Sequence, residues 1–146
     1  MPPLTREVKI GRMVDADLEA VKEIDRLLVR EERALSCPSS VETECLAYRP
    51  ALNFVAEVGG KIVGFLLGDI RRERYGIGMG GWTDMIGVAS EYQRKGIGRR
   101  LMLAFWAECQ RNYIRTNVIV REDDERLIRF YTSMGLRRGK LINLEM

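Results

Sequence analysis

A short turn with two glycines is the segment of this sequence best suited to chemistry. This glycine turn, residues 93–99, reads Gln93-Arg94-Lys95-Gly96-Ile97-Gly98-Arg99 and precedes a predicted helix. Glycines let a backbone approach a ligand closely, and the N–H groups and dipole of a helix start attract negative charge. With its cationic side chains, the turn predicts a pyrophosphate site. The alternative is a helix start whose basic face is merely solvated.

The glycine turn differs from two familiar phosphate-binding motifs. It lacks the GxxxxGK[ST] pattern of nucleoside-triphosphate P-loops, and it lacks the GxGxxG pattern of dinucleotide folds. The sequence therefore favours neither an NTPase nor a dinucleotide-binding enzyme.

Histidine is absent from the sequence, which excludes several kinds of catalytic site. A Ser-His-Asp triad, a Cys-His dyad and a His-ligated zinc or iron site all need this side chain. Cys37, Cys45 and Cys109 are spaced too widely for a disulfide framework or a CxxC motif, and we expect them to be packing residues. We expect no metal site and a reduced, cytoplasmic setting.

The composition is that of an ordinary globular protein, with 46% hydrophobic and 31% charged residues. The formal net charge of +3 suits an anionic ligand but is too small for a dedicated nucleic-acid binder. No apolar run reaches the length of about 18 residues that a membrane-spanning helix needs. We expect one domain over residues 1–146, with neither a nucleic-acid nor a membrane partner.

The first elements that would position the glycine turn are a strand and two helices. Residues 8–12 alternate as in a strand, and Asp15 or Asp17 can cap an amphipathic helix over residues 18–28. A serine capping box predicts a short second helix within residues 39–50.

An antiparallel meander is predicted next. Residues 52–58 and 61–70 alternate on either side of Gly59-Gly60, which is a typical hairpin turn. A polar connection over residues 71–81, rich in arginine and glycine, leads to a strand over residues 82–88.

The chain after the glycine turn is predicted to alternate helices and strands. Apolar residues recur at helical spacing from Ile97, and residues 113–120 form a buried strand. Asp124 can cap a helix that bears the apolar residues of 127–134, and residues 141–144 form a last strand.

The resulting order is β-α-α-β-β-β-α-β-α-β. It predicts an α+β fold in three α/β/α layers, with a mixed and mostly antiparallel sheet of six or seven strands. The crossover through the long helix places the glycine turn at the end of a strand.

Two motifs extend this interpretation. Ile86-Gly87-Val88 followed by residues 92–102 closely resembles the acyl-CoA-binding motif of the GNAT superfamily of N-acyltransferases, (R/Q)xxGx(G/A). Residues 127–136, with Phe130-Tyr131 and a terminal Gly-Leu, look like that family's second motif. The element order also fits the family across nearly the whole chain.

The resemblance implies that acetyl-CoA is the acyl donor and that an amine attacks the thioester directly, without a covalent intermediate. The implied pyrophosphate site is the glycine turn. The implied pantetheine contacts are the backbone groups of Ile86, Gly87 and Val88.

The resemblance also assigns a catalytic role to Tyr131, which matches the family's tyrosine that protonates the CoA sulfur. A phenol can do so because its pKa lies above that of the thiol. The alternative is an aromatic core residue of an amphipathic helix.

Asp84 is the candidate general base. It lies two residues before Ile86, so we expect it to share the face of that residue, and a carboxylate near the acceptor cleft could take the amine proton. The alternative is a solvated or ion-paired strand aspartate.

Two residues depart from the family pattern. Ile119 stands where some protein N-terminal acetylating relatives carry a glutamate, which weakens the transfer of their substrate to this chain. Asp124 stands where many relatives have an asparagine that bonds the pantetheine arm, and an ionised aspartate can only accept. Asp124 keeps part of that cofactor-binding role or serves as a helix N-cap.

The sequence therefore predicts an N-acetyltransferase that acts on a small-molecule amine or on a protein or peptide amine, with homodimerisation an open option. The alternative is a non-catalytic acyl-CoA sensor or interaction module. The connection between the predicted third and fourth strands carries Arg71, Arg72, Arg74, Tyr75 and Trp82. In this family that connection often borders the acceptor cleft, although a charged segment can also be merely solvent-facing.

Overall fold

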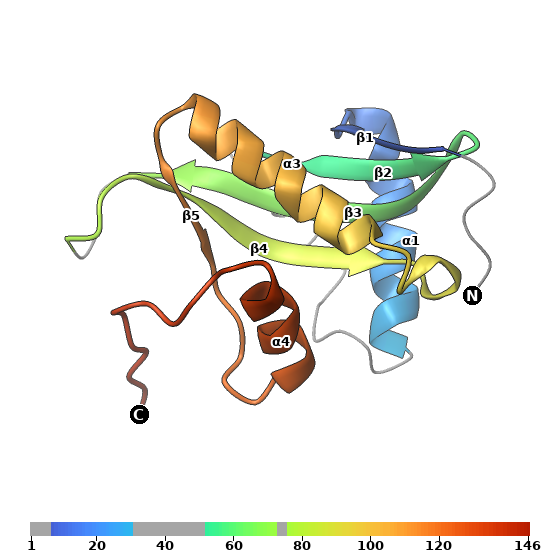
Figure 1. Ribbon diagram of the computed structural model, residues 1–146. Coiled ribbons are helices and arrows are strands. Elements are labelled where there is room, and N and C mark those ends of the chain that lie inside the picture. Colours follow the sequence, from blue (N-terminus) through green and yellow to red (C-terminus); the bar gives the residue numbers. More distant parts are fainter. Residues whose placement is uncertain (1–6, 31–51, 73–75) are drawn as a thin grey trace.

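A five-stranded mixed sheet forms the centre of the computed structural model, which describes residues 7–30, 52–72 and 76–146 (Figure 1). The strands lie side by side in chain order, with the first four antiparallel and the last pair parallel. They are β1 Val8–Arg12, β2 Phe54–Val58, β3 Lys61–Arg71, β4 Gly80–Val88 and β5 Arg115–Val118.

Helices cover both faces of the sheet, as the sequence predicts. Figure 1 shows α3 (Ile97–Arg111) across one face and α1 (Leu18–Arg30) behind the other, with α4 (Glu125–Ser133) beside α3. Two short 3-10 turns, η1 (Asp15–Asp17) and η2 (Ser90–Tyr92), precede α1 and the glycine turn. The three α/β/α layers are thereby confirmed.

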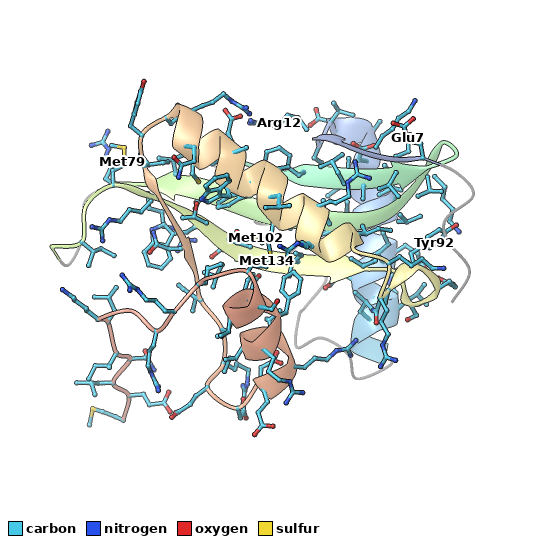
Figure 2. The ribbon with its side chains drawn as sticks, viewed as in Figure 1. Glu7, Arg12, Met79, Tyr92, Met102 and Met134 are labelled. Atoms are coloured by element: carbon cyan, nitrogen blue, oxygen red, sulfur yellow. The ribbon has the colours of Figure 1, made fainter. Side chains whose placement is uncertain are left out.

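The sheet is buried on both sides by separate apolar clusters. On the α3 side, Leu101, Met102 and Phe105 pack with sheet residues such as Leu66, and Met134 just after α4 packs against this cluster (Figure 2). On the α1 side, α1 packs on Phe65 and Leu67, with Val21, Ile24 and Leu28 as its buried apolar residues. Burial on both faces explains why β3 is an almost continuous apolar run.

The Gly59-Gly60 hairpin is confirmed. Both glycines have positive φ, 57° and 81°, as a two-residue turn between antiparallel strands requires. Asp17, which the sequence predicts alongside Asp15 as a cap of the helix seen as α1, instead lies in η1, where its Oδ2 accepts the Val14 N–H at 2.9 Å.

Several predicted strand boundaries are wrong. The strand predicted over residues 113–120 is limited to β5, because α3 ends in a turn where Tyr113 N–H bonds to Gln110 O and Ile114 N–H to Cys109 O. Tyr113 is 97% exposed rather than buried. Arg71 and Gly80 belong to β3 and β4, so the connection between these strands is shorter than predicted.

The predicted last strand is also wrong. Residues 141–146 form no strand and are exposed, so the described sheet has five strands rather than six or seven. A short apolar segment becomes a strand only where a neighbour supplies hydrogen bonds, and none does so here within the described residues. The predicted helix within residues 39–50 lies outside the described residues.

Candidate functional site

The parallel strands β4 and β5 separate, and this separation exposes an edge of β4. Register between β4 and β5 runs only from Gly80 opposite Arg115 to Thr83 opposite Val118. Beyond Thr83, β4 continues to Val88 paired with β3 alone. Figure 1 shows β5 turning away from β4 along this stretch.

Backbone groups of Ile86 and Val88 point toward the exposed edge. Ala89 N–H bonds to Val63 O at 2.8 Å, which fixes the alternation of hydrogen-bonded pairs between β3 and β4. Gly87 then bonds toward β3, whereas Ile86 and Val88 direct their N–H and C=O groups to the β5 side. An extended polar chain could pair there as an added strand.

The glycine turn follows at the end of this edge. Gly96 caps α3 with a φ of 82°, and Arg94 also has a positive φ of 61°. Within the described chain, the backbone N–H groups of residues 94–99 donate to no protein acceptor. A run of unpaired N–H groups at a helix start is an arrangement that binds anions.

The cations of the glycine turn are available to a ligand. Arg94 and Arg99 are exposed and Lys95 is half-buried, and in the described chain none of the three forms a salt bridge. Arg100 differs, because its Nη1 donates to the Val8 carbonyl at 2.9 Å and ties α3 to β1. Positive charge is therefore concentrated at residues 94–99.

Gln93 has a different role from its neighbours. Its side-chain Nε2 donates to the Val88 carbonyl at 2.8 Å, and its Oε1 accepts from Arg126 Nη2 at 3.1 Å. These bonds join the end of β4 to the first turn of α4. The Gln93 side chain thus fixes the position of the glycine turn relative to β4 and α4.

Tyr131 lies on α4, on the same side of the sheet as α3. It is 5% exposed and belongs to the α3-side cluster with Ile97, and Ile86 and Val88 pack against that cluster. Its hydroxyl makes no hydrogen bond with the described part of the chain. Burial, and secondarily the Asp124 carboxylate, raise the pKa of Tyr131 far above its ordinary value.

Contacts of α4 explain why Tyr131 and the glycine turn are neighbours. A Cβ placed on Gly98 would meet the Phe130 ring at 3.5 Å, so the first turn of α3 packs closely on α4. The Phe130 and Tyr131 rings meet edge to face at 5.1 Å. Asp124 is the N-cap of α4, where its Oδ1 accepts from Leu127 N–H at 3.1 Å.

Asp84 lies elsewhere than we expected. Leu67 is opposite Met85 and Gly68 is opposite Thr83, so Asp84 is the extra residue of a β-bulge. Ile86 packs on the α3-side cluster, whereas Asp84 bonds to Arg71. The expectation that Asp84 and Ile86 share a face is therefore wrong, since the bulge interrupts the alternation.

The partner of Asp84 is the most informative residue that sequence reasoning missed. Arg71 Nη2 lies 2.6 Å from both carboxylate oxygens of Asp84, and its Nε donates to Asp69 Oδ1 at 2.9 Å. The Arg71 guanidinium also lies 5.5 Å from the Trp82 ring centroid. An aspartate at position 69 within an apolar strand was the available sequence signal. Asp84 is thus paired with Arg71, while 18% of its side chain stays exposed.

The described residues offer neither a metal site nor a membrane-spanning helix. No group of three or more Asp, Glu or Cys side chains is arranged to hold a metal ion there. Nor does any of the described helices have the length and apolar character needed to cross a membrane.

Comparison with known proteins gives one family match. The model of the acetyltransferase (GNAT) family matches residues 18–136. No curated protein sequence matches significantly.

Solved structures share the fold along almost their whole length. The aminoglycoside N-acetyltransferase AAC(6')-Iy in complex with CoA has a TM-score of 0.78 at 14% identity, covering 100% of this chain and 98% of that chain. A possible acetyltransferase from Clostridium difficile 630 has a TM-score of 0.78 at 19% identity, covering 95% and 96%. The aminoglycoside 6'-N-acetyltransferase AAC(6')-IG from Acinetobacter haemolyticus has a TM-score of 0.75 at 18% identity, covering 94% and 97%.

Proposed function

Because the chain belongs to the acetyltransferase (GNAT) family, we propose that it transfers an acetyl group from acetyl-CoA to a primary amine by direct attack in a ternary complex. It is an acyl-CoA-dependent N-acetyltransferase, with acetyl-CoA as acyl donor. We further propose which class of amine accepts the acetyl group and which side chains move the protons.

The glycine turn is the observation that carries the proposal. Six consecutive backbone N–H groups, those of residues 94–99, are unpaired within the described chain and are flanked by three cations. These donors and charges fit the pyrophosphate of CoA. The open edge at Ile86 and Val88, with Gly87 between them, fits the pantetheine arm. Its amides can pair there as an added strand with the Ile86 N–H and C=O and the Val88 N–H, since the Val88 carbonyl already accepts from Gln93.

Tyr131 is the proposed general acid. Acetyl-CoA supplies an activated acyl group with a thiolate as leaving group, and a buried phenol can donate a proton to that sulfur. The Tyr131 phenol is protonated at neutral pH, because its ordinary pKa already lies well above 7 and burial raises it further. Its hydroxyl makes no bond within the described chain that would compete for the proton.

Asp84 is the proposed general base. It follows directly after Thr83, the last β4 residue paired with β5, and therefore stands where the two strands separate. A carboxylate has about four lone-pair sites, of which the Arg71 contacts use two. The remaining sites can accept a proton from the ammonium form of the acceptor, directly or through water.

The acceptor class is proposed to be a small-molecule amine or a peptide or protein amine. Several solved structures with this fold are titled aminoglycoside acetyltransferases, which makes aminoglycosides a sensible first arm of a test. Peptides with a free α-amine and peptides with an internal lysine form the second and third arms.

The test measures release of CoA thiol from acetyl-CoA with and without each amine, with mass spectrometry of the product. We expect thiol release that depends on one amine class, with acetyl recovered on that amine. An enzyme that binds acetyl-CoA but releases thiol with none of the three classes would instead be an acyl-CoA sensor. The matched control is Tyr131→Phe, which should bind CoA normally and turn over slowly.

A further inference from the structure

The Arg71 guanidinium bridges two carboxylates that differ in burial. Its Nε is bonded to Asp69, which is 1% exposed, and its Nη2 is bonded to Asp84. Side-chain exposure rises from 2% at Asp69 to 25% at Arg71 and is 18% at Asp84. The Trp82 ring lies against the guanidinium. The planar Arg71 side chain thus joins a buried carboxylate to a partly accessible one.

We propose that Arg71 is a positioning residue for Asp84, which it holds at the β4 bulge in the orientation needed to accept a proton from the acceptor amine. The inference rests on the proposed function, because it assumes that Asp84 is the general base. Arg71 itself need not touch either substrate.

The β-bulge explains why Asp84 needs this support. A bulged residue has no partner opposite it, so the ladder that normally fixes the direction of a strand side chain is locally broken. β5 also pairs no further than Thr83, the residue before Asp84. The backbone at Asp84 is therefore less constrained by both neighbouring strands. The Arg71 contacts fix the orientation of the Asp84 side chain instead.

The planar guanidinium of Arg71, whose N–H donors form a rigid fork, allows the side chain to hydrogen-bond to both carboxylates. A guanidinium presents Nε and Nη2 in a fixed plane, so a bond to Asp69 determines where the Nη2 group points. A lysine at this position would carry one point charge and could not hold two carboxylates in a defined geometry. The positioning of Asp84 therefore depends on the shape of the guanidinium as well as on its charge.

A double-mutant cycle between Arg71→Gln and Asp84→Asn tests the inference. We expect each single variant to lower kcat/KM for the amine by about 10-fold to 100-fold, as misplacement of a reacting group does. If Arg71 acts through Asp84, the double variant should be no worse than Asp84→Asn alone. The KM for acetyl-CoA should stay unchanged in all three.

Two more variants separate positioning from folding. Arg71→Lys keeps the charge but loses the fork, so we expect it to recover stability while its amine kcat/KM remains reduced. Lys61→Gln removes an exposed cation at the start of β3, beside the Gly59-Gly60 hairpin, and should leave activity and melting temperature unchanged. Melting temperature and CoA binding, measured for every variant, show whether each has folded.

Multiplicative effects in the double variant, or full activity of Arg71→Lys, would overturn the inference while leaving the acetyltransferase function intact. Unchanged activity in Asp84→Asn would overturn it as well. Absence of amine-dependent turnover in the wild-type protein, by contrast, would contradict the proposed function itself.

Discussion

The side-chain amide of Gln93 donates a 2.8 Å hydrogen bond to the carbonyl oxygen of Val88. The first residue of the glycine turn is thereby bonded to the last residue of β4. This bond sets where the unpaired N–H groups of the turn stand relative to the open edge of the strand. One ligand can therefore contact both surfaces.

Gln93→Ala should weaken CoA binding without unfolding the protein. Loss of one neutral hydrogen bond costs about 1 kcal/mol, which corresponds to a decrease in affinity of about 5-fold. Calorimetric titration with CoA measures the change. The matched control is Arg126→Ala, which removes only the exposed bond to Gln93 Oε1 and should change affinity less. Equal CoA affinity in Gln93→Ala and wild type would show that the hydrogen bond from Gln93 to Val88 is not needed for binding.

Gly96→Asp should abolish CoA binding, and Gly96→Asn should largely retain it. Gly96 has a φ of 82° and open space around its Cβ direction, so both side chains fit and both face the same backbone strain. Asparagine tolerates this conformation and is neutral, whereas aspartate adds a negative charge beside the phosphates. We expect an affinity loss of at least about 100-fold for the aspartate alone. Thermal stabilisation by CoA reports it, and similar losses in the two variants would assign the effect to strain instead of charge.

Tyr131→Phe should lower kcat for acetyl transfer by about 100-fold to 10,000-fold, the usual contribution of a general acid. The affinity for CoA should remain within a few-fold of wild type, because the ring still fills its place in the α3-side cluster. Steady-state kinetics with the identified amine gives kcat, and calorimetry gives the affinity. A variant as active as wild type would reduce Tyr131 to a core residue.

The burial of Tyr131 also predicts how activity and stability depend on pH. Because burial raises the pKa of Tyr131 above its ordinary value of 10.0, the phenol stays protonated throughout the neutral range. Its contribution to stability is complete below about pH 10 and is lost only as pH rises beyond the unfolded-state value. We expect kcat/KM to rise as the acceptor amine deprotonates, with no decline below about pH 10. A decline near pH 8 that is absent from Tyr131→Phe would contradict this.

Asp124→Ala should destabilise the protein by about 1 kcal/mol, since it removes the N-cap bond to Leu127 N–H. Asp124→Asn keeps an oxygen acceptor and should match wild type in a denaturant unfolding curve. Comparing CoA affinity between the two variants then separates the cap from a contact with the pantetheine arm. An unchanged stability in Asp124→Ala would show that the cap contributes nothing.

The local part of the fold could be predicted from the sequence. The Gly59-Gly60 turn, the apolar stripe that starts at Ile97 and the cap at Asp124 each depend on a few adjacent residues, and all three are present. Their signals are local because backbone conformation and helical spacing are decided within a few residues. The link between the glycine turn and Tyr131 comes from the family resemblance instead, which assigns both to one ligand, and the structure packs α4 against the first turn of α3.

The remaining features depend on pairing between distant segments. The bulge at Asp84 is a property of register between β3 and β4, which alternation within either strand does not reveal. The Arg71 to Asp84 ion pair spans two strands, and no spacing rule links these positions. Residues 141–144 are mostly apolar, as in many strands, yet composition alone cannot supply the neighbour whose hydrogen bonds make a strand.

The most direct test of the account is a calorimetric titration of the wild-type protein with CoA, acetyl-CoA and pantetheine. The account predicts that CoA and acetyl-CoA bind with similar affinity, because the unpaired N–H groups of residues 94–99 hold the pyrophosphate that both ligands share. Pantetheine lacks the pyrophosphate and should bind at least about 100-fold more weakly. Absence of binding to CoA, or equal binding of pantetheine, would contradict the assignment of the glycine turn as the phosphate site.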